Sequence, residues 1–298
     1  MAKILITGAT GYIGSHIAKS CLSNGHAVRI LTRSSSDLAR LESIAGQLRV
    51  FRMDPSHQEQ SILDSLAAMG GADTIVHCAT SHGRDTESDA DIRSSNVAFP
   101  GALLNAAIDL GVGHFVNTDT VLPAETNRYA ASKAEFREIA KASTAVGSTR
   151  ISNLTLELVY GPNDDPRKFA TWVTRACLEA GRVIDLTAGT QLRDFVYVDD
   201  VVSAYLAVIQ SAPSIRWQSW RIGTDHPVSV RHFVEMIHRA CGAKATLNFG
   251  AVPSRIEPPA GPAQQSLSHS SIAWTPEWSI EQGIAALVAS ERKALASP

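Results

Sequence analysis

A tyrosine and a lysine four residues apart are the first pattern in this chain that could do chemistry. They bound the segment Tyr129-Ala130-Ala131-Ser132-Lys133. On a helix, this spacing places both side chains on one face. Because a nearby ammonium favours the tyrosinate, we expect Lys133 to lower the pKa of Tyr129. The pair therefore predicts an acid/base group that works near neutral pH.

Three glycines follow the first apolar run of the chain. Gly8 allows a tight turn, Gly11 lets the backbone approach a pyrophosphate, and Gly14 lets a helix pack closely on the preceding strand. The start of that helix offers unpaired N–H groups and a partial positive charge to phosphates. A strand before the motif and a helix after it indicate a dinucleotide site. The expected cofactor contacts are Gly8, Thr10, Gly11, Tyr12, Ile13, Gly14, Cys78, Ala79, Tyr129 and Lys133.

The residues after the second apolar run distinguish between the two nicotinamide cofactors. An acidic side chain there would bind the ribose 2′-hydroxyl of NAD. This chain has Arg33 instead, followed by Ser34. A guanidinium and a hydroxyl suit a 2′-phosphate, which favours NADP(H) and leaves NAD(H) as the alternative. Asp54 follows the third run, where its carboxylate could accept from adenine or cap a turn before Pro55.

Short apolar runs alternate with helical patterns through the first half of the chain. Strands are expected at 4–7, 28–32, 48–53, 74–79 and 114–117, and helices at 12–23, 37–45, 58–69, 95–110 and 129–145. This alternation predicts an α/β fold with a Rossmann-type doubly wound parallel sheet. The second half mixes strands at 153–158, 195–198 and 220–222 with helices at 167–180, 199–209, 230–241 and 280–295, and 253–262 is expected to be a loop.

Two domains are expected from this pattern. Residues 1–160 with about 194–222 would form the NAD(P)-binding Rossmann domain. About 161–193 and 223–298 would form a smaller mixed α/β domain that binds substrate. Asp199 is expected to cap the helix that begins there.

Composition excludes several other classes of function. The chain has 298 residues, 44% hydrophobic, and a net charge of −2, so nothing attracts it to nucleic acid or an anionic membrane. Four widely spaced cysteines without metal-ligand spacing indicate free thiols and no metal site. We find no signal-peptide pattern and no apolar run of about 18–20 residues, so we expect a cytoplasmic protein.

Together with the glycine motif, the Tyr129/Lys133 pair resembles the extended short-chain dehydrogenase/reductases, which include NAD(P)-dependent sugar-nucleotide epimerases, dehydratases and reductases. The resemblance spans nearly the whole chain and includes residues 159–162, 193–200, 221–224 and 274–276. It implies a hydroxyl that binds the reacting substrate oxygen, for which the spacing favours Thr118 and keeps Thr120 in reserve. It also implies a contact of Lys133 with the nicotinamide ribose, and a homodimer through the helices near 97–110 and 130–145.

The residues expected to contact substrate match the family's pattern only in part. Arg193 matches the arginine that family epimerases use on the substrate diphosphate, and Arg255 is a candidate second clamp. Asp119 stands where related dehydratases carry an aspartate, but Thr120 replaces their glutamate, so dehydration is disfavoured. Leu158 replaces an asparagine that contacts the sugar nucleotide, and the segment from 118 to 129 is short for the family. His82 is a further candidate substrate contact on the loop after the fourth strand.

These observations predict an NADP(H)-dependent reductase of a keto group on a nucleotide-activated sugar, with Tyr129 as the proton donor. A sugar-nucleotide epimerase would use the same residues. A reductase of a non-nucleotide aldehyde or ketone would fit Leu158 and the short segment. A sensor that binds NADP(H) without turnover remains the alternative outside enzymes.

Overall fold

The computed structural model describes the chain except for residues 54–57, 69, 84–86, 212–214, 255–263 and 297–298. It divides into two compact units. Unit 1 comprises 1–156, 202–221 and 258–274, and unit 2 comprises 157–201, 222–257 and 275–298. Each unit is therefore built from three separate stretches of chain.

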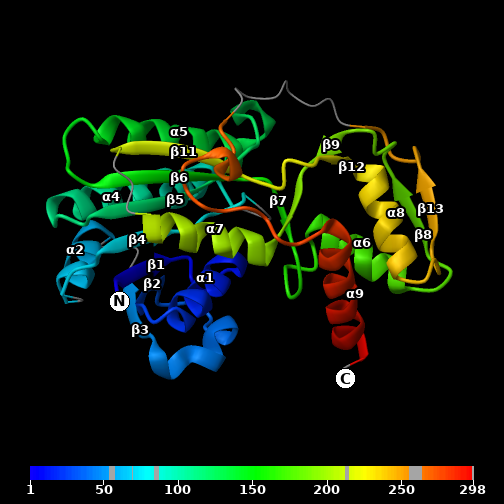
Figure 1. Cartoon of the computed structure of the whole chain (residues 1–298), viewed down its shortest axis with the longest axis horizontal. Coiled ribbons are helices and arrows are strands. Elements are labelled where there is room, and N and C mark those ends of the chain that lie inside the picture. Colours follow the sequence, from blue (N-terminus) through cyan, green and yellow to red (C-terminus); the bar gives the residue numbers. More distant parts are fainter. Residues whose placement is uncertain (54–57, 69, 84–86, 212–214, 255–263, 297–298) are drawn as a thin grey trace. The chain divides into compact units, whose positions relative to one another are not determined.

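A seven-stranded sheet in the order β11-β6-β5-β4-β1-β2-β3 forms the centre of unit 1 (Figure 1). Its strands are β1 (Lys3–Thr7), β2 (Ala27–Arg33), β3 (Arg49–Met53), β4 (Thr74–His77), β5 (His114–Thr120), β6 (Arg150–Leu156) and β11 (Trp217–Ile222). The pairs from β3 through to β6 are parallel. This is the doubly wound arrangement that the alternating pattern predicts, with a crossover point between β1 and β4.

Helices cover both faces of the sheet. They are α1 (Tyr12–Ser23), α2 (Gln58–Ala68), α3 (Asp89–Arg93), α4 (Phe99–Asp109), α5 (Arg128–Ser143) and the later part of α7 (Val198–Ser211). Phe115 of β5 and Phe136 of α5 are fully buried in one core cluster with Leu103 of α4. Tyr205 of α7 contacts the side of β5 opposite to this cluster, through Thr118. Strands buried on both faces explain the unbroken apolar runs in the sequence.

The described residues of unit 2 form three small pairs of strands and three further helices. The pairs are β7 (Leu158–Tyr160) with β10 (Phe195–Tyr197), β9 (Leu192–Arg193) with β12 (Val228–Ser229), and β8 (Val183–Leu186) with β13 (Thr246–Phe249). The helices are α6 (Phe169–Leu178), α8 (Val230–Ala240) and α9 (Ile280–Ala296). Phe195 and Phe233 stack at 3.7 Å between ring centroids and fix β10 against α8. Arg175 of α6 bonds the buried Glu291 of α9 at 2.5 Å.

Several elements differ from the sequence expectations. The first residues of the helix expected at 95–110 form one turn of π-helix (η3, Ser94–Ala98), and α4 begins only at Phe99. The short helix α3 before this turn was not predicted. Residues Ala39–Gln47 form a 3₁₀-helix (η1) rather than an α-helix. Asp199 lies in the first turn of α7 and does not precede it. The short strands β8 and β13 were not predicted, because each has only four residues, which alternate exposed with buried positions in β8 and exposed with half-buried positions in β13.

Candidate active site

The glycine motif forms a close-packed turn between β1 and α1. Gly8 has φ +71°, and a Cβ there would lie 2.4 Å from the backbone nitrogen of Ala79, just after β4. A Cβ on Gly14 would lie 2.2 Å from the carbonyl oxygen of Gly8. The α1 helix begins after Gly11, and its first turn contains no acidic residue. These features leave backbone N–H groups at the carboxyl ends of β1 and β4, an arrangement that fits a dinucleotide pyrophosphate.

The other expected cofactor contacts surround this turn. Thr10 precedes α1, while Tyr12 and Ile13 begin it. Cys78 and Ala79 follow β4 and lie against Gly8. The structure therefore brings these residues together at one edge of the sheet.

Two arginines meet at the end of β2. Arg33 is the last residue of the strand and its side chain is exposed. Arg52 of the neighbouring β3 donates from Nη1 to the carbonyl oxygen of Ser34 at 2.7 Å, and more weakly to that of Arg33 at 3.4 Å. Arg52 was not predicted from the sequence as a cofactor contact. Its register opposite Thr32 places it beside the end of β2. Asp54 lies outside the described residues.

Tyr129 lies in the first turn of α5, which Asn127 caps by accepting the Ala130 N–H at 2.8 Å. Burial, followed by the negative charge of Asp119, raises the pKa of Tyr129 to about 12. A hydrogen bond with the Thr120 hydroxyl opposes this rise without cancelling it. The phenol is therefore protonated near neutral pH, whereas the sequence predicted a pKa lowered by Lys133. Burial outweighs that expected effect.

Lys133 is buried one helical turn after Tyr129. Its burial lowers the pKa of the ammonium, and the negative charge of Asp119 and the Cys78 thiol oppose this change. The side chain thus lies near the end of β4 as well as near β5. This position is consistent with the expected role of Lys133 beside a bound cofactor.

The two candidate threonines of β5 have different partners. The Thr120 hydroxyl lowers the pKa of Tyr129 and accepts the Leu122 N–H at 3.3 Å. The Thr118 hydroxyl instead lies 2.6 Å from the buried Tyr205 hydroxyl and donates to Cys78 Sγ at 3.2 Å. Of the two candidates, the reserve one is therefore the hydroxyl that acts on the tyrosine.

A buried asparagine that sequence analysis missed organises the loop after β4. Asn96 lies in the π-turn and accepts from the Ser81 N–H at 2.7 Å and the Thr80 hydroxyl at 3.0 Å. Its amide donates to the Ser81 carbonyl at 2.8 Å and to Ser132 Oγ at 2.9 Å. The next residue of the loop, His82, has its ring 4.8 Å from that of Tyr129. Asn96 therefore connects this loop to the helix that carries Tyr129.

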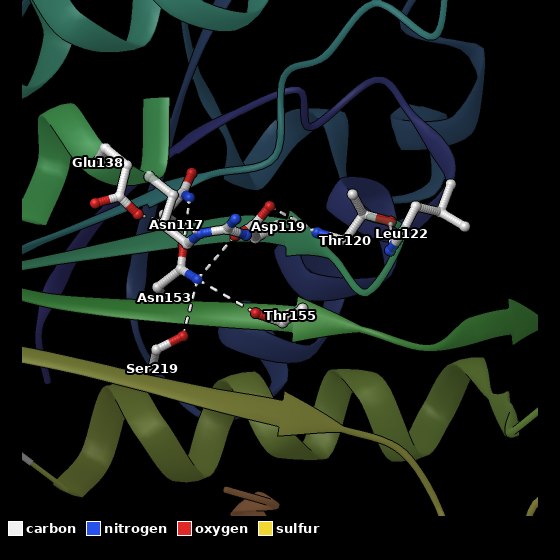
Figure 2. A network of polar contacts seen from close by, with 9 residues as sticks. Asn117, Asp119, Thr120, Leu122, Glu138, Asn153, Thr155 and Ser219 are labelled. Atoms are coloured by element: carbon white, nitrogen blue, oxygen red, sulfur yellow. Dashed lines mark hydrogen bonds and ion pairs between the residues drawn. The ribbon is translucent and has the colours of Figure 1, made fainter. Parts of the chain in front are cut away.

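Asp119 does not face outward as a substrate contact would. Its side chain is 0% exposed and forms an ion pair with Arg137 at 2.8 Å. Asn153 of β6 also donates to it, at 3.0 Å, within the polar network that Figure 2 shows. Alternation along β5 explains this position, because Asp119 lies on the face opposite to Thr118 and Thr120.

The expected diphosphate contact Arg193 belongs to unit 2, at the end of β9. Its Nη1 donates to the carbonyl oxygen of Leu192 at 2.7 Å, and its side chain is partly exposed. The adjacent Asp194 carboxylate is buried and accepts the N–H groups of Thr224 and Asp225. Arg255, the candidate second clamp, lies outside the described residues.

Comparison with known proteins identifies the family. The model of the NAD dependent epimerase/dehydratase family matches residues 4–223, which include the glycine turn, Tyr129 and Lys133. The chain belongs to this family. Family members are NAD(P)-dependent enzymes of the extended short-chain dehydrogenase/reductase type, as the resemblance implied.

Curated relatives align with almost the whole of this chain. CDP-abequose synthase of Salmonella typhimurium is 27% identical, over 96% of this chain and 97% of the relative. UDP-glucose 4-epimerase of Corynebacterium glutamicum is 24% identical, over 92% and 91%. Among solved structures, the UDP-glucuronic acid 4-epimerase of Bacillus cereus has a TM-score of 0.81 at 22% identity, covering 98% of this chain and 99% of that chain. This last likeness confirms the fold.

No helix in the described part of the chain is both long and apolar enough to cross a membrane. Nor do the described residues bring together three or more His, Cys, Asp or Glu side chains that could hold a metal ion.

Proposed function

We propose that this family member is an NADP(H)-dependent reductase of a keto group on a nucleotide-activated sugar. The observation that supports the proposal is the position of Tyr129 in the first turn of α5, one helical turn before the buried Lys133, in a chain whose glycine turn fits a dinucleotide. Reduction of a ketone needs a proton donor for the new alkoxide, and a neutral phenol is such a donor. The names of two relatives, CDP-abequose synthase and the dTDP-4-dehydro-6-deoxy-D-allose reductase of Streptomyces bikiniensis, support a sugar-nucleotide substrate.

The roles of the remaining residues follow from their places. The glycine turn would hold the cofactor pyrophosphate, and a bound nicotinamide supplies the hydride. Tyr129 would then give its proton to the substrate oxygen, with the Thr120 hydroxyl orienting that oxygen. Lys133 would bind the nicotinamide ribose, and its charge would favour the tyrosinate that remains.

For the substrate hydroxyl contact we propose Thr120 in place of Thr118. Its support is its effect on the pKa of Tyr129, while the Thr118 hydroxyl is engaged by Tyr205 and Cys78. Thr118 would instead shape the region beside Cys78 where the nicotinamide is expected.

Preference for NADP(H) is proposed from the two arginines at the end of β2. Arg33 is exposed at the end of β2, and Arg52 donates to the backbone carbonyl oxygens of residues 33 and 34. Two cations at this place suit a 2′-phosphate, whereas binding of the ribose 2′-hydroxyl of NAD would call for an acidic residue. The substrate diphosphate would be bound by Arg193 of unit 2.

The chain is further proposed to form a homodimer through α4 and α5. Leu110, just after α4, and Ile139 of α5 are large apolar side chains with exposures of 48% and 42%. Light scattering of the purified protein would test this expectation. A monomer across the micromolar range would contradict it.

The test of the function begins with the purified protein and its bound nucleotide. We expect no tightly retained NAD, and NADPH binding at least tenfold tighter than NADH, with this ratio lost in Arg33→Ala. Tyr129→Phe should lower reduction of 4-keto nucleotide sugars by about 10²- to 10⁴-fold while NADPH still binds. Thr120→Val should lose more turnover than Thr118→Val. Stoichiometric retained NAD with interconversion of sugar epimers would replace the reductase by an epimerase.

A further inference from the structure

One buried carboxylate joins the strand that carries Thr120 to the helix that carries Tyr129. Asp119 Oδ1 accepts the backbone N–H of Thr120 at 2.8 Å. Asp119 Oδ2 accepts from Arg137 Nη1 of α5 at 2.8 Å and from Asn153 Nδ2 of β6 at 3.0 Å. Three donors from three elements therefore hold a side chain that has no exposed surface.

Asn153 extends this cluster across the sheet (Figure 2). Its amide also lies 3.0 Å from Ser219 Oγ of β11 and 3.3 Å from Thr155 Oγ1. Its oxygen accepts from Asn117 Nδ2 of β5 at 2.7 Å. A buried ion pair is stabilising only when its remaining polar atoms have partners, and this network supplies them for the carboxylate. The strands β5, β6 and β11 are thereby fixed to one charged group.

The partner of this carboxylate lies in register with the expected catalytic pair. Tyr129, Lys133 and Arg137 follow one another at intervals of four residues, so they share one face of α5. The negative charge of Asp119 acts on the first two, because it raises the pKa of both Tyr129 and Lys133. The carboxylate thus has a geometric link to Thr120 and an electrostatic link to Tyr129 and Lys133.

We propose that Asp119 and Arg137 form a positioning pair that holds Thr120 against Tyr129 and balances the charge beside Lys133. The proposal rests on the proposed function of Tyr129 as a proton donor. It assigns Asp119 a role different from the substrate contact that the sequence suggested, since all its bonds lie inside unit 1. A carboxylate bound in this way is not available to a substrate hydroxyl, which agrees with the expectation that dehydration is disfavoured.

The charges around the pair determine what its removal should do. The Arg137 side chain is 25% exposed, and its Nε lies 3.9 Å from Oε1 of Glu138, whose side chain is 71% exposed. From α5 come Tyr129, Lys133, Arg137 and Glu138, and the end of β4 contributes the Cys78 thiol. Burial raises the pKa of that thiol to about 11, so it is uncharged near neutral pH.

Asp119→Asn removes the negative charge that raises the pKa of Tyr129, so this pKa should fall. Arg137→Gln leaves the Asp119 charge in place and should not lower the pKa. The double variant also lacks the Asp119 charge, so Tyr129 should titrate there as it does in Asp119→Asn. A role in stability alone would not separate the two partners in this way.

The experiment labels the five tyrosines with ¹³C at Cζ and follows their resonances from pH 7 to 10.5. Tyr129 is assigned by the loss of its signal in Tyr129→Phe. We expect Tyr129 to begin titrating below pH 10.5 in Asp119→Asn and in the double variant, but not in the wild type, Arg137→Gln or the matched control Glu138→Gln. In parallel, kcat/KM of Asp119→Asn should decline as the pH rises over the same range.

The outcomes separate this inference from the proposed function. An unchanged Tyr129 resonance in a folded Asp119→Asn protein would overturn the positioning pair, even if the wild type reduces keto sugars. A shift of Tyr129 in a protein without reductase activity would support the pair and overturn the function alone. If Asp119→Asn does not fold, the double variant takes its place. A Tyr129 resonance that titrates below pH 10.5 in the double variant but not in Arg137→Gln would support the pair, and an unchanged resonance in both would overturn it.

Discussion

The glycine turn gives the sharpest prediction, because the same change from glycine to alanine should lower the stability of the protein at Gly14 and raise it at Gly101. In Gly14→Ala, the new Cβ would lie 2.2 Å from the Gly8 carbonyl oxygen, 2.8 Å from its carbonyl carbon and 3.0 Å from Ala9 Cα. All three are backbone atoms of the turn, so no side chain can rotate to make room. The start of α1 would have to move away from β1 by about 1 Å to reach ordinary contact.

The expected cost can be set against a matched control. Overpacking of this kind costs typically about 1–3 kcal/mol, and a clash with backbone belongs at the upper end. Gly101→Ala, inside α4, meets nothing within 4 Å and has no positive φ. It should increase stability by about 0.5–1 kcal/mol, because alanine loses less conformational entropy in a helix than glycine.

Urea unfolding measures both changes in stability, and fluorescence titration measures NADPH binding. Gly14→Ala should lower the free energy of unfolding and weaken NADPH binding by tenfold or more, since the displaced N–H groups would no longer point at the pyrophosphate. Gly101→Ala should leave NADPH affinity unchanged. If Gly14→Ala binds NADPH as the wild type does, then the turn does not hold the pyrophosphate and the reasoning fails.

Two further predictions concern buried polar side chains that hold the elements of each unit together. Asn96→Ala removes the partners of Thr80, Ser81 and Ser132, so it should lower the free energy of unfolding by about 2–3 kcal/mol and lower kcat, as urea unfolding and steady-state kinetics would show. An unchanged denaturation midpoint would mean that water replaces the amide. Glu291→Gln weakens the bond to Arg175 between α9 and α6, and its cost should be only about 1–2 kcal/mol because Arg175 is 38% exposed. In a denaturation experiment this loss should disappear when Arg175→Met is already present.

The sheet and the positions of the motifs could be predicted from the sequence because they depend on local patterns. Buried parallel strands give unbroken apolar runs, and α1 has the expected bounds because Gly11 and Asn24 enclose a clear helical period. The spacing of Tyr129 and Lys133 likewise needs only the helical period.

Features that depend on distant contacts could not be predicted in this way. The choice between Thr118 and Thr120 depends on Tyr205, which lies 87 residues after Thr118 and reaches it only in the folded sheet. The side to which Asp119 points follows from the pleat, but its ion pair depends on Arg137 meeting it across the packed helix. The protonation of Tyr129 depends on burial, which a sequence pattern does not measure.

The discontinuous build of unit 1 has a consequence for how the chain is made. The sheet is complete only when β11 joins β6, and residues 264–274 then add to the same unit, with Ser266 bridged to Arg221. At a synthesis rate of about 5–20 residues per second, the interval between the end of β6 and β11 lasts roughly 3–12 s. During that time β6 presents an unpaired edge, the kind of surface on which nascent chains aggregate. The yield of folded protein would then depend on how well this edge is shielded during synthesis, as well as on the final stability.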